Sequence, residues 1–224
     1  MDVTVIFRNR WCVRSMVLAL LVGLPMPLWA DLEQAFEAVH QKDYATAYTL
    51  FLELAEAGNA QAQYNLGVLI SDGQGTEKDP ARALSWFEKA ASQGFADAQY
   101  RLGNLYEFGQ SVPQSYENAA VWYKKAAEQG NASAQTNLAV LYANGQGVNQ
   151  DIVLAYVWSN LAASQGVVEA LQNRETVAKE MSPVMLQRVR KISREYFQKY
   201  VAPFQSEQAR HLVGQPNPAP PQHQ

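Results

Sequence analysis

The chain has 224 residues, of which 48% are hydrophobic and 17% are charged. These values are close to ordinary globular usage and exclude both a wholly disordered chain and a protein that crosses the membrane many times. The 18 basic and 21 acidic residues give a formal net charge of −3, whereas a dedicated nucleic-acid binder is usually basic. We therefore expect a folded protein without a nucleic-acid partner.

Residues 1–30 have the layout of a secretory signal peptide, with arginines first, an apolar stretch from Ser15 to Leu24 and a small residue, Ala30, at the end. The apolar stretch is about 10 residues long, whereas a membrane-spanning helix needs about 20. We predict cleavage after Ala30, no membrane span afterwards, and a periplasmic or secreted protein of a Gram-negative bacterium. The alternative is an uncleaved anchor, because Leu28 is bulky for a position near a cleavage site.

Removal of this segment changes the charge and the cysteine content. The remaining chain has 15 basic and 20 acidic residues, a net charge of −5. The single cysteine, Cys12, is lost with the segment, so the mature chain can form neither a disulfide nor a thiolate metal site.

A 36-residue period organises most of the rest. The residues in register are Ala62, Ala98, Ala134 and Ala170; Leu66, Leu102 and Leu138; Gly73, Gly109 and Gly145; Trp86, Trp122 and Trp158; and Gly58, Gly94, Gly130 and Gly166. Within each period, two stretches of helical spacing flank a polar turn, which predicts a helix, a turn and a helix. The last glycine set follows the second helix and is predicted to end it in a left-handed conformation. The other repeated positions are interpreted as core.

These repeats resemble the Sel1-like repeats, a subfamily of the tetratricopeptide superfamily. The pattern covers Ala62 to Glu169 and is visible in AQYNLGVLISDGQGTEKDPARALSWFEKAASQGFAD, AQYRLGNLYEFGQSVPQSYENAAVWYKKAAEQGNAS and AQTNLAVLYANGQGVNQDIVLAYVWSNLAASQGVVE. The resemblance implies an all-α fold, a right-handed α/α solenoid of helix–turn–helix repeats with N- and C-terminal capping helices. The second unit departs from the pattern at Gly109 to Pro113 and at Ser115, so we expect its loop to have a different shape.

The periodicity divides the chain into five segments. They are the signal peptide (1–30), an N-terminal capping helical pair (31–58), three repeats (59–169), C-terminal capping helices (170–200) and a disordered tail rich in proline and glutamine (201–224). The closing helix is predicted from Val184 to Tyr200, after Ser182 as its N-cap and Pro183 at the first helical position.

The repeats contain no catalytic or metal-binding arrangement. The histidines are His40, at a predicted helix end, and His211 and His223, in or near the tail. Without an interior histidine or a mature cysteine, neither a Ser-His-Asp nor a Cys-His arrangement can form on the repeats. We predict that the protein is not an enzyme and has no cofactor or metal. The alternative is an envelope hydrolase or peptidoglycan-processing factor.

The first helix of each repeat carries three residues that would face a shared groove, because a spacing of four and then three places them on one side. By resemblance to tetratricopeptide grooves, the candidate contact residues are Tyr64, Val68 and Ser71; Tyr100, Asn104 and Glu107; and Thr136, Val140 and Ala143. Tyr64 and Tyr100 are the best anchors, because aromatic residues dominate interface energies. The alternative is that the tyrosines only pack between neighbouring hairpins. None of the nine is basic, which makes an acidic peptide tail a poor ligand for this groove.

Charge is uneven along the chain. Residues 31–173 have a net charge of −9, whereas residues 174–200 have a net charge of +4. The candidate basic patch on the closing helix consists of Arg188, Arg190, Lys191, Arg194 and Lys199. It would meet an anionic partner or lipid headgroups, or it is a solvated face that complements the acidic repeats.

Together these features predict an exported, non-enzymatic scaffold that binds a protein or peptide partner in the groove of the solenoid. The resemblance implies a role in envelope assembly, regulation or host interaction. The sequence leaves the partner and the oligomeric state open.

Overall fold

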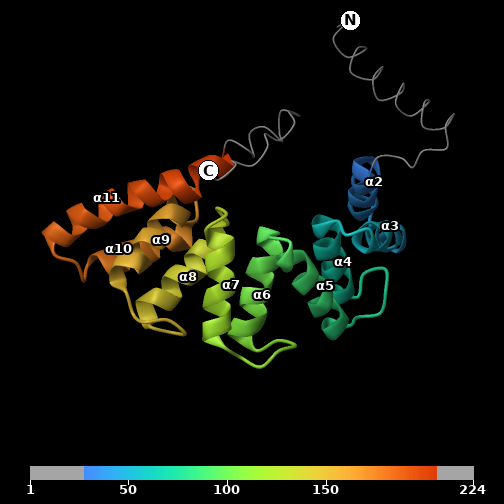
Figure 1. The fold of residues 1–224 in the computed structure, drawn as a ribbon, viewed down its shortest axis with the longest axis horizontal. Helices are drawn as coiled ribbons and strands as arrows, with labels where there is room; N and C mark the ends of the chain where they lie inside the picture. The colour runs from blue at the N-terminus through green and yellow to red at the C-terminus, as the bar shows by residue number, and fades with distance from the viewer. Residues whose placement is uncertain (1–27, 206–224) are drawn as a thin grey trace, which may run out of the picture. The chain divides into compact units, whose positions relative to one another are not determined.

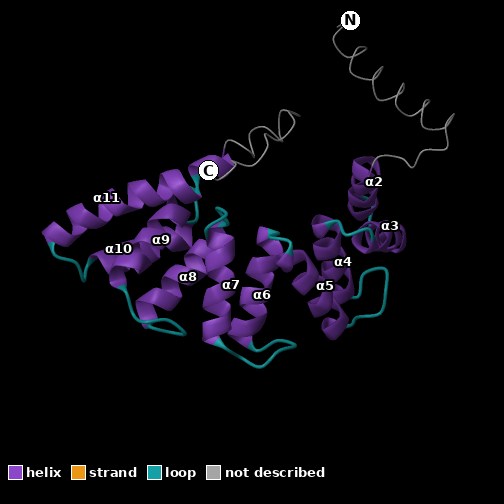
Figure 2. Cartoon of the chain, in the orientation of Figure 1, coloured by secondary structure: helices purple, strands orange, loops and turns teal. Residues whose placement is uncertain are grey.

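The computed structural model describes residues 28–205, which form ten α-helices joined by turns and loops (Figure 1). The helices are α2 (Leu28–His40), α3 (Tyr44–Glu56), α4 (Ala60–Asp72), α5 (Pro80–Ser92), α6 (Ala96–Phe108), α7 (Tyr116–Ala127), α8 (Ala132–Asn144), α9 (Ile152–Ser164), α10 (Val168–Ala178) and α11 (Pro183–Tyr200). This part of the chain contains no strand (Figure 2), which confirms the all-α prediction. The signal peptide predicted for residues 1–30 and the tail predicted for 201–224 lie almost wholly outside the described residues.

The chain divides into two compact units, one ending at Ala83 and the other beginning at Leu84. In the N-terminal unit, α3 packs against both α2 and α4, and the rings of Phe36 and Phe51 meet edge to face at 5.4 Å. In the C-terminal unit, each helix from α6 to α10 packs against the next, and α11 packs against α9. Consecutive helices thus form the pairs that the 36-residue period predicts.

The residues in register form the core of the two units. Leu66, Leu102 and Leu138 are almost completely buried, and so are the alanines that precede each by four residues. Burying a leucine side chain contributes about 1.5 to 3 kcal/mol, so each of these leucines stabilises its repeat by about that amount. The core interpretation is confirmed for these positions, although Trp122 is only half-buried.

Side-chain caps determine where the second helices of the repeats begin. Asp79 accepts a hydrogen bond from the backbone N–H of Arg82 at 3.0 Å, and Asp151 accepts from that of Leu154 at 3.0 Å. Ser115, at the same position of the second repeat, accepts from the N–H of Asn118 at 3.2 Å. An aspartate and a serine can each satisfy an N-terminal amide that has no helical partner, so the exchange preserves the start of the helix.

The loops within the three repeats have the same backbone conformation at their two special positions. Ser111 has φ of 62°, close to the values at Gly75 (70°) and Gly147 (67°), and the preceding glycines are left-handed in all three loops. The expectation that the second loop differs in shape is therefore wrong at these positions. Glycine normally supplies this conformation, and the serine adopts it because the rest of the loop is shared. The four glycines predicted to end second helices also have positive φ, between 85° and 93°.

The closing helix begins as predicted. Ser182 caps α11 by accepting a hydrogen bond from Met185, and Pro183 occupies its first turn. The packed chain continues past Tyr200, since Val201 is fully buried and the Phe204 ring lies against Gly130. Within residues 28–205, no helix combines the length and the hydropathy that a membrane span requires.

Candidate functional site

The predicted groove residues of the first repeat lie in the N-terminal unit, on α4. Tyr64, Val68 and Ser71 are all partly exposed. They follow one another at helical spacing on the same side of α4, as the sequence predicts. The other six predicted residues belong to the C-terminal unit.

On α6, Asn104 and Glu107 belong to a polar cluster centred on Tyr123 of α7. The Tyr123 hydroxyl is 2.7 Å from Asn104 Oδ1 and also hydrogen-bonds to the Glu107 carboxylate. From α8, Asn137 Nδ2 donates to the Tyr123 oxygen at 3.0 Å. Burial and the carboxylate of Glu107 raise the pKa of Tyr123 well above its usual value, so this hydroxyl stays protonated. We call these four residues the Tyr123 cluster.

Tyr100 packs beside this cluster. Its ring centroid is 5.9 Å from that of Tyr123, and its side chain remains partly exposed. One side of the Tyr100 ring therefore packs against the core of its own repeat, and the rest of the side chain is exposed at the surface. Asn104 and Glu107 are held in fixed positions by their internal hydrogen bonds, so a ligand would meet a pre-organised polar surface.

The three predicted residues of α8 have different surroundings. Thr136 is only 3% exposed, and its hydroxyl donates to the carbonyl of Ala132, which leaves little of it for a ligand. Val140 and Ala143 line a cavity of about 240 Å³ that is bounded by residues of α8, α9 and α10. Asn173 of α10 lines the same cavity, and its buried amide nitrogen has no hydrogen-bond partner within the described residues.

Sequence reasoning missed Tyr123, Asn137 and Asn173. In the 36-residue register, Tyr123 corresponds to Phe87 in the first repeat and Ser159 in the third. The hydroxyl of Tyr123 therefore departs from the apolar ring of Phe87, and the sequence shows this difference. Asn137 and Asn173 share one register position, directly before the leucine of the core pattern in the third repeat. A polar residue next to a core position was the signal available.

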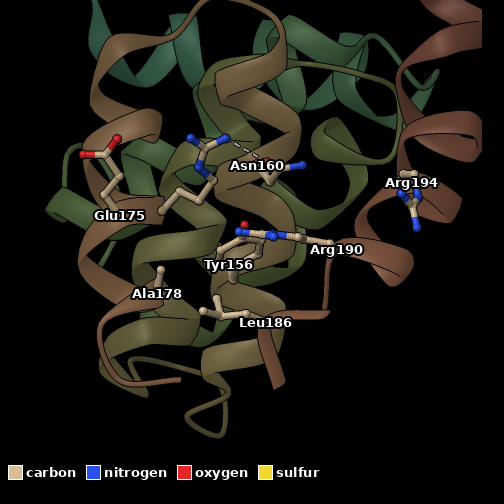
Figure 3. A pocket seen from close by; sticks show the side chains of 8 residues that line it. Tyr156, Asn160, Glu175, Ala178, Leu186, Arg190 and Arg194 are labelled. Atoms are coloured by element: carbon tan, nitrogen blue, oxygen red, sulfur yellow. Dashed lines mark hydrogen bonds between the residues drawn. The ribbon is translucent and has the colours of Figure 1, made fainter. Parts of the chain in front are cut away.

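All five residues of the predicted basic patch are exposed on α11, and two of them, Arg190 and Arg194, line a second cavity, of about 490 Å³, between α9, α10 and α11. Arg174 of α10 lines it as well and was not part of the predicted patch. Figure 3 shows this cavity from close by. Lys199 lies further along α11, with its amine 4.7 Å from the centroid of the Tyr200 ring.

Residues 28–205 bring no three His, Cys, Asp or Glu side chains together in a way that would hold a metal ion. The raised pKa of Tyr123 keeps its hydroxyl protonated, so this group acts as a hydrogen-bond donor.

Comparison with known proteins identifies the repeats. The family model described as the Sel1 repeat matches residues 60–95, 96–131 and 132–167. A Sel1 repeat protein from Oxalobacter formigenes has 35% identity and a TM-score of 0.61, over 63% of this chain and 58% of its own. A protective antigen, c5321, of uropathogenic Escherichia coli strains, which displays an SLR fold, has 30% identity and a TM-score of 0.66, over 94% of this chain and 49% of its own.

The chain thus spans 58% and 49% of the lengths of these two proteins. No curated protein matches it. What the two solved structures share with the chain is therefore the repeat and its fold.

Proposed function

We propose, from the premise that this chain is a Sel1-like repeat protein, that it is an exported, non-enzymatic scaffold that binds a protein or peptide partner. Repeats of this type form helical scaffolds typical of protein–protein interaction. The signal-peptide layout of residues 1–30 supports export, and with it a role in envelope assembly, regulation or host interaction. The predicted groove on α6 and α8 is the proposed binding surface.

The cavity beside Val140 and Ala143 is the observation that carries this proposal. Val140 and Ala143 of the predicted groove line it together with Ala139 and Val177, and Asn173, which also lines it, has a buried amide nitrogen without a partner among residues 28–205. Buried polar groups in folded proteins are nearly always hydrogen-bonded to protein or to water, so this nitrogen is a donor that an acceptor of a ligand would satisfy. A peptide carbonyl beside an apolar side chain would supply both the acceptor and the packing.

The groove is tested by capture of partners in the native cell. We expect a protein crosslinked to the tagged wild type to be recovered about tenfold less well with Tyr100→Ala/Val140→Ala, because loss of an interface anchor costs at least 1 kcal/mol. Captured proteins are identified by mass spectrometry, and circular dichroism checks that the variant is folded. The control is Val121→Ala/Val184→Ala, which trims two exposed valines of α7 and α11 outside the groove. Equal recovery with both variants would contradict groove binding.

Export and cleavage are tested by the mass of the protein recovered from its native cell. We expect a chain that begins at Asp31, since the predicted cleavage follows Ala30. A chain that begins at Met1 and is recovered in the membrane fraction would instead support the alternative, a scaffold tethered to the membrane by its uncleaved signal. This measurement is independent of the groove variants.

A further inference from the structure

The cavity between α9, α10 and α11 is separate from the groove, because it shares no lining residue with the nine predicted contact residues. Its volume is about 490 Å³, which accommodates side chains of a peptide. Three guanidinium groups line it, from Arg174, Arg190 and Arg194, against one carboxylate, Glu175. The charged groups at the cavity therefore sum to about +2.

These guanidinium groups have no acidic partner in the described part of the chain. None of the three forms an ion pair with a carboxylate of residues 28–205. Figure 3 places the Glu175 carboxylate on the far side of the cavity from Arg190 and Arg194. An arginine carries five N–H donors in a planar fork that matches a carboxylate. The three arginines therefore have N–H groups available to bind an oxyanion in the cavity.

One of the three arginines is held in place. Arg174 Nη1 donates to Asn160 Oδ1 at 3.0 Å, a bond drawn as a dashed line in Figure 3. Asn160 also lines the cavity, and Figure 3 shows its amide nitrogen on the side away from this bond. A fixed guanidinium and an amide donor provide a pre-organised polar end, which reduces the entropy lost on binding.

The other end of the cavity is apolar. Ala178 and Leu186 line it and lie together below Tyr156 in Figure 3, away from Asn160. A ligand that fits both ends carries an acidic group beside an apolar one. Such a combination is found where an acidic residue follows or precedes a leucine in a peptide.

Two of the basic residues of α11 line the cavity. Arg190 and Arg194 are four residues apart and therefore lie on the same side of the helix, whereas Arg188 and Lys191 do not line the cavity.

We propose that this cavity binds an acidic peptide segment of a protein partner, with a carboxylate held by Arg174 and Arg190 and an adjacent apolar side chain placed against Leu186. The proposal rests on the proposed protein-binding function and adds a second binding site to it. This site prefers acidic segments, whereas the groove contains no basic residue that would bind them. Arg194, at the exposed edge, attracts the acidic segment. Binding is expected to weaken as salt is added, because the charges are partly exposed.

The test uses the full purified chain and a short fluorescein-labelled peptide of alternating leucine and glutamate, with fluorescence anisotropy as the readout. We expect Arg190→Gln/Arg194→Gln to weaken binding about tenfold, since it removes two guanidinium groups that attract the glutamate carboxylates. The matched control, Arg188→Gln/Lys191→Gln, removes the same charge from the same helix outside the cavity and should bind within about twofold of the wild type. Both pairs are exposed, so neither change is expected to affect folding.

The proposal would be overturned by equal binding of a peptide with glutamine in place of glutamate, by equal losses in the two arginine variants, or by binding only to vesicles of phosphatidylglycerol. The groove variant Tyr100→Ala/Val140→Ala should keep its affinity for the acidic peptide. Failure of the peptide to bind, with partner capture through the groove intact, would reject the cavity alone. Peptide binding without any captured partner would reject the groove alone.

Discussion

Replacing Gln135 with leucine should lower the free energy of unfolding by about 2 kcal/mol, because it removes two hydrogen bonds made by a completely buried side chain. Gln135 is completely buried at the start of α8. Its amide nitrogen donates to the carbonyl of Ala127 at 3.0 Å, and its oxygen accepts from Gln165 Nε2 at 2.8 Å. One side chain thus joins the end of α7 to the end of α9. Urea unfolding followed by circular dichroism measures the loss.

The control for this experiment is Gln165→Ala, which removes only one of the two hydrogen bonds. Gln165 is half-buried, and its loss should cost about 1 kcal/mol. Gln99 repeats the arrangement, donating to Ala91 and accepting from Gln129, so Gln99→Leu should resemble Gln135→Leu. A loss below that of Gln165→Ala would show that Gln135 acts only by filling space.

The sequence predicts those features that depend on one residue and its neighbours along the chain. Helix ends belong to this group, since a left-handed residue after a helix favours glycine and an unpaired N-terminal amide favours a short polar side chain. The positive φ at Gly58 and the cap formed by Ser182 follow from these local rules. The departure at Ser111 misled the prediction, because a non-glycine residue adopts the strained conformation when the rest of the loop requires it.

Features that depend on which atoms meet across helices were not predictable in the same way. The period indicates that Gln135 and Tyr123 lie near core positions, but it does not say which carbonyl or carboxylate each would reach. Arg174 was missed for the same reason, because its place beside Arg190 depends on how α10 and α11 pack. Helical spacing correctly places trios of residues on one side of a helix, and yet it does not distinguish buried Thr136 from half-exposed Val140.

Gly103→Ala should destabilise the protein by about 2 kcal/mol, although alanine is the better helix former by about 1 kcal/mol. Gly103 is buried inside α6, and a Cβ atom there would overlap the Cδ1 and Cε1 atoms of Tyr123 and lie 3.1 Å from its Cγ. The missing side chain therefore makes room for the Tyr123 ring. Urea unfolding again measures the change.

The third repeat provides the matched comparison, because its residues in the same register are Ala139 and Ser159, without a ring. In a Tyr123→Ser background, Gly103→Ala should change sign and stabilise the protein by up to about 1 kcal/mol, since only helix propensity remains. Destabilisation of equal size in both backgrounds would show that the ring is not the obstacle.

The same substitution, Gly103→Ala, should also affect binding. An alanine that displaces the ring also moves the hydroxyl that holds Asn104 and Glu107. Gly103→Ala should therefore weaken partner capture as well as folding.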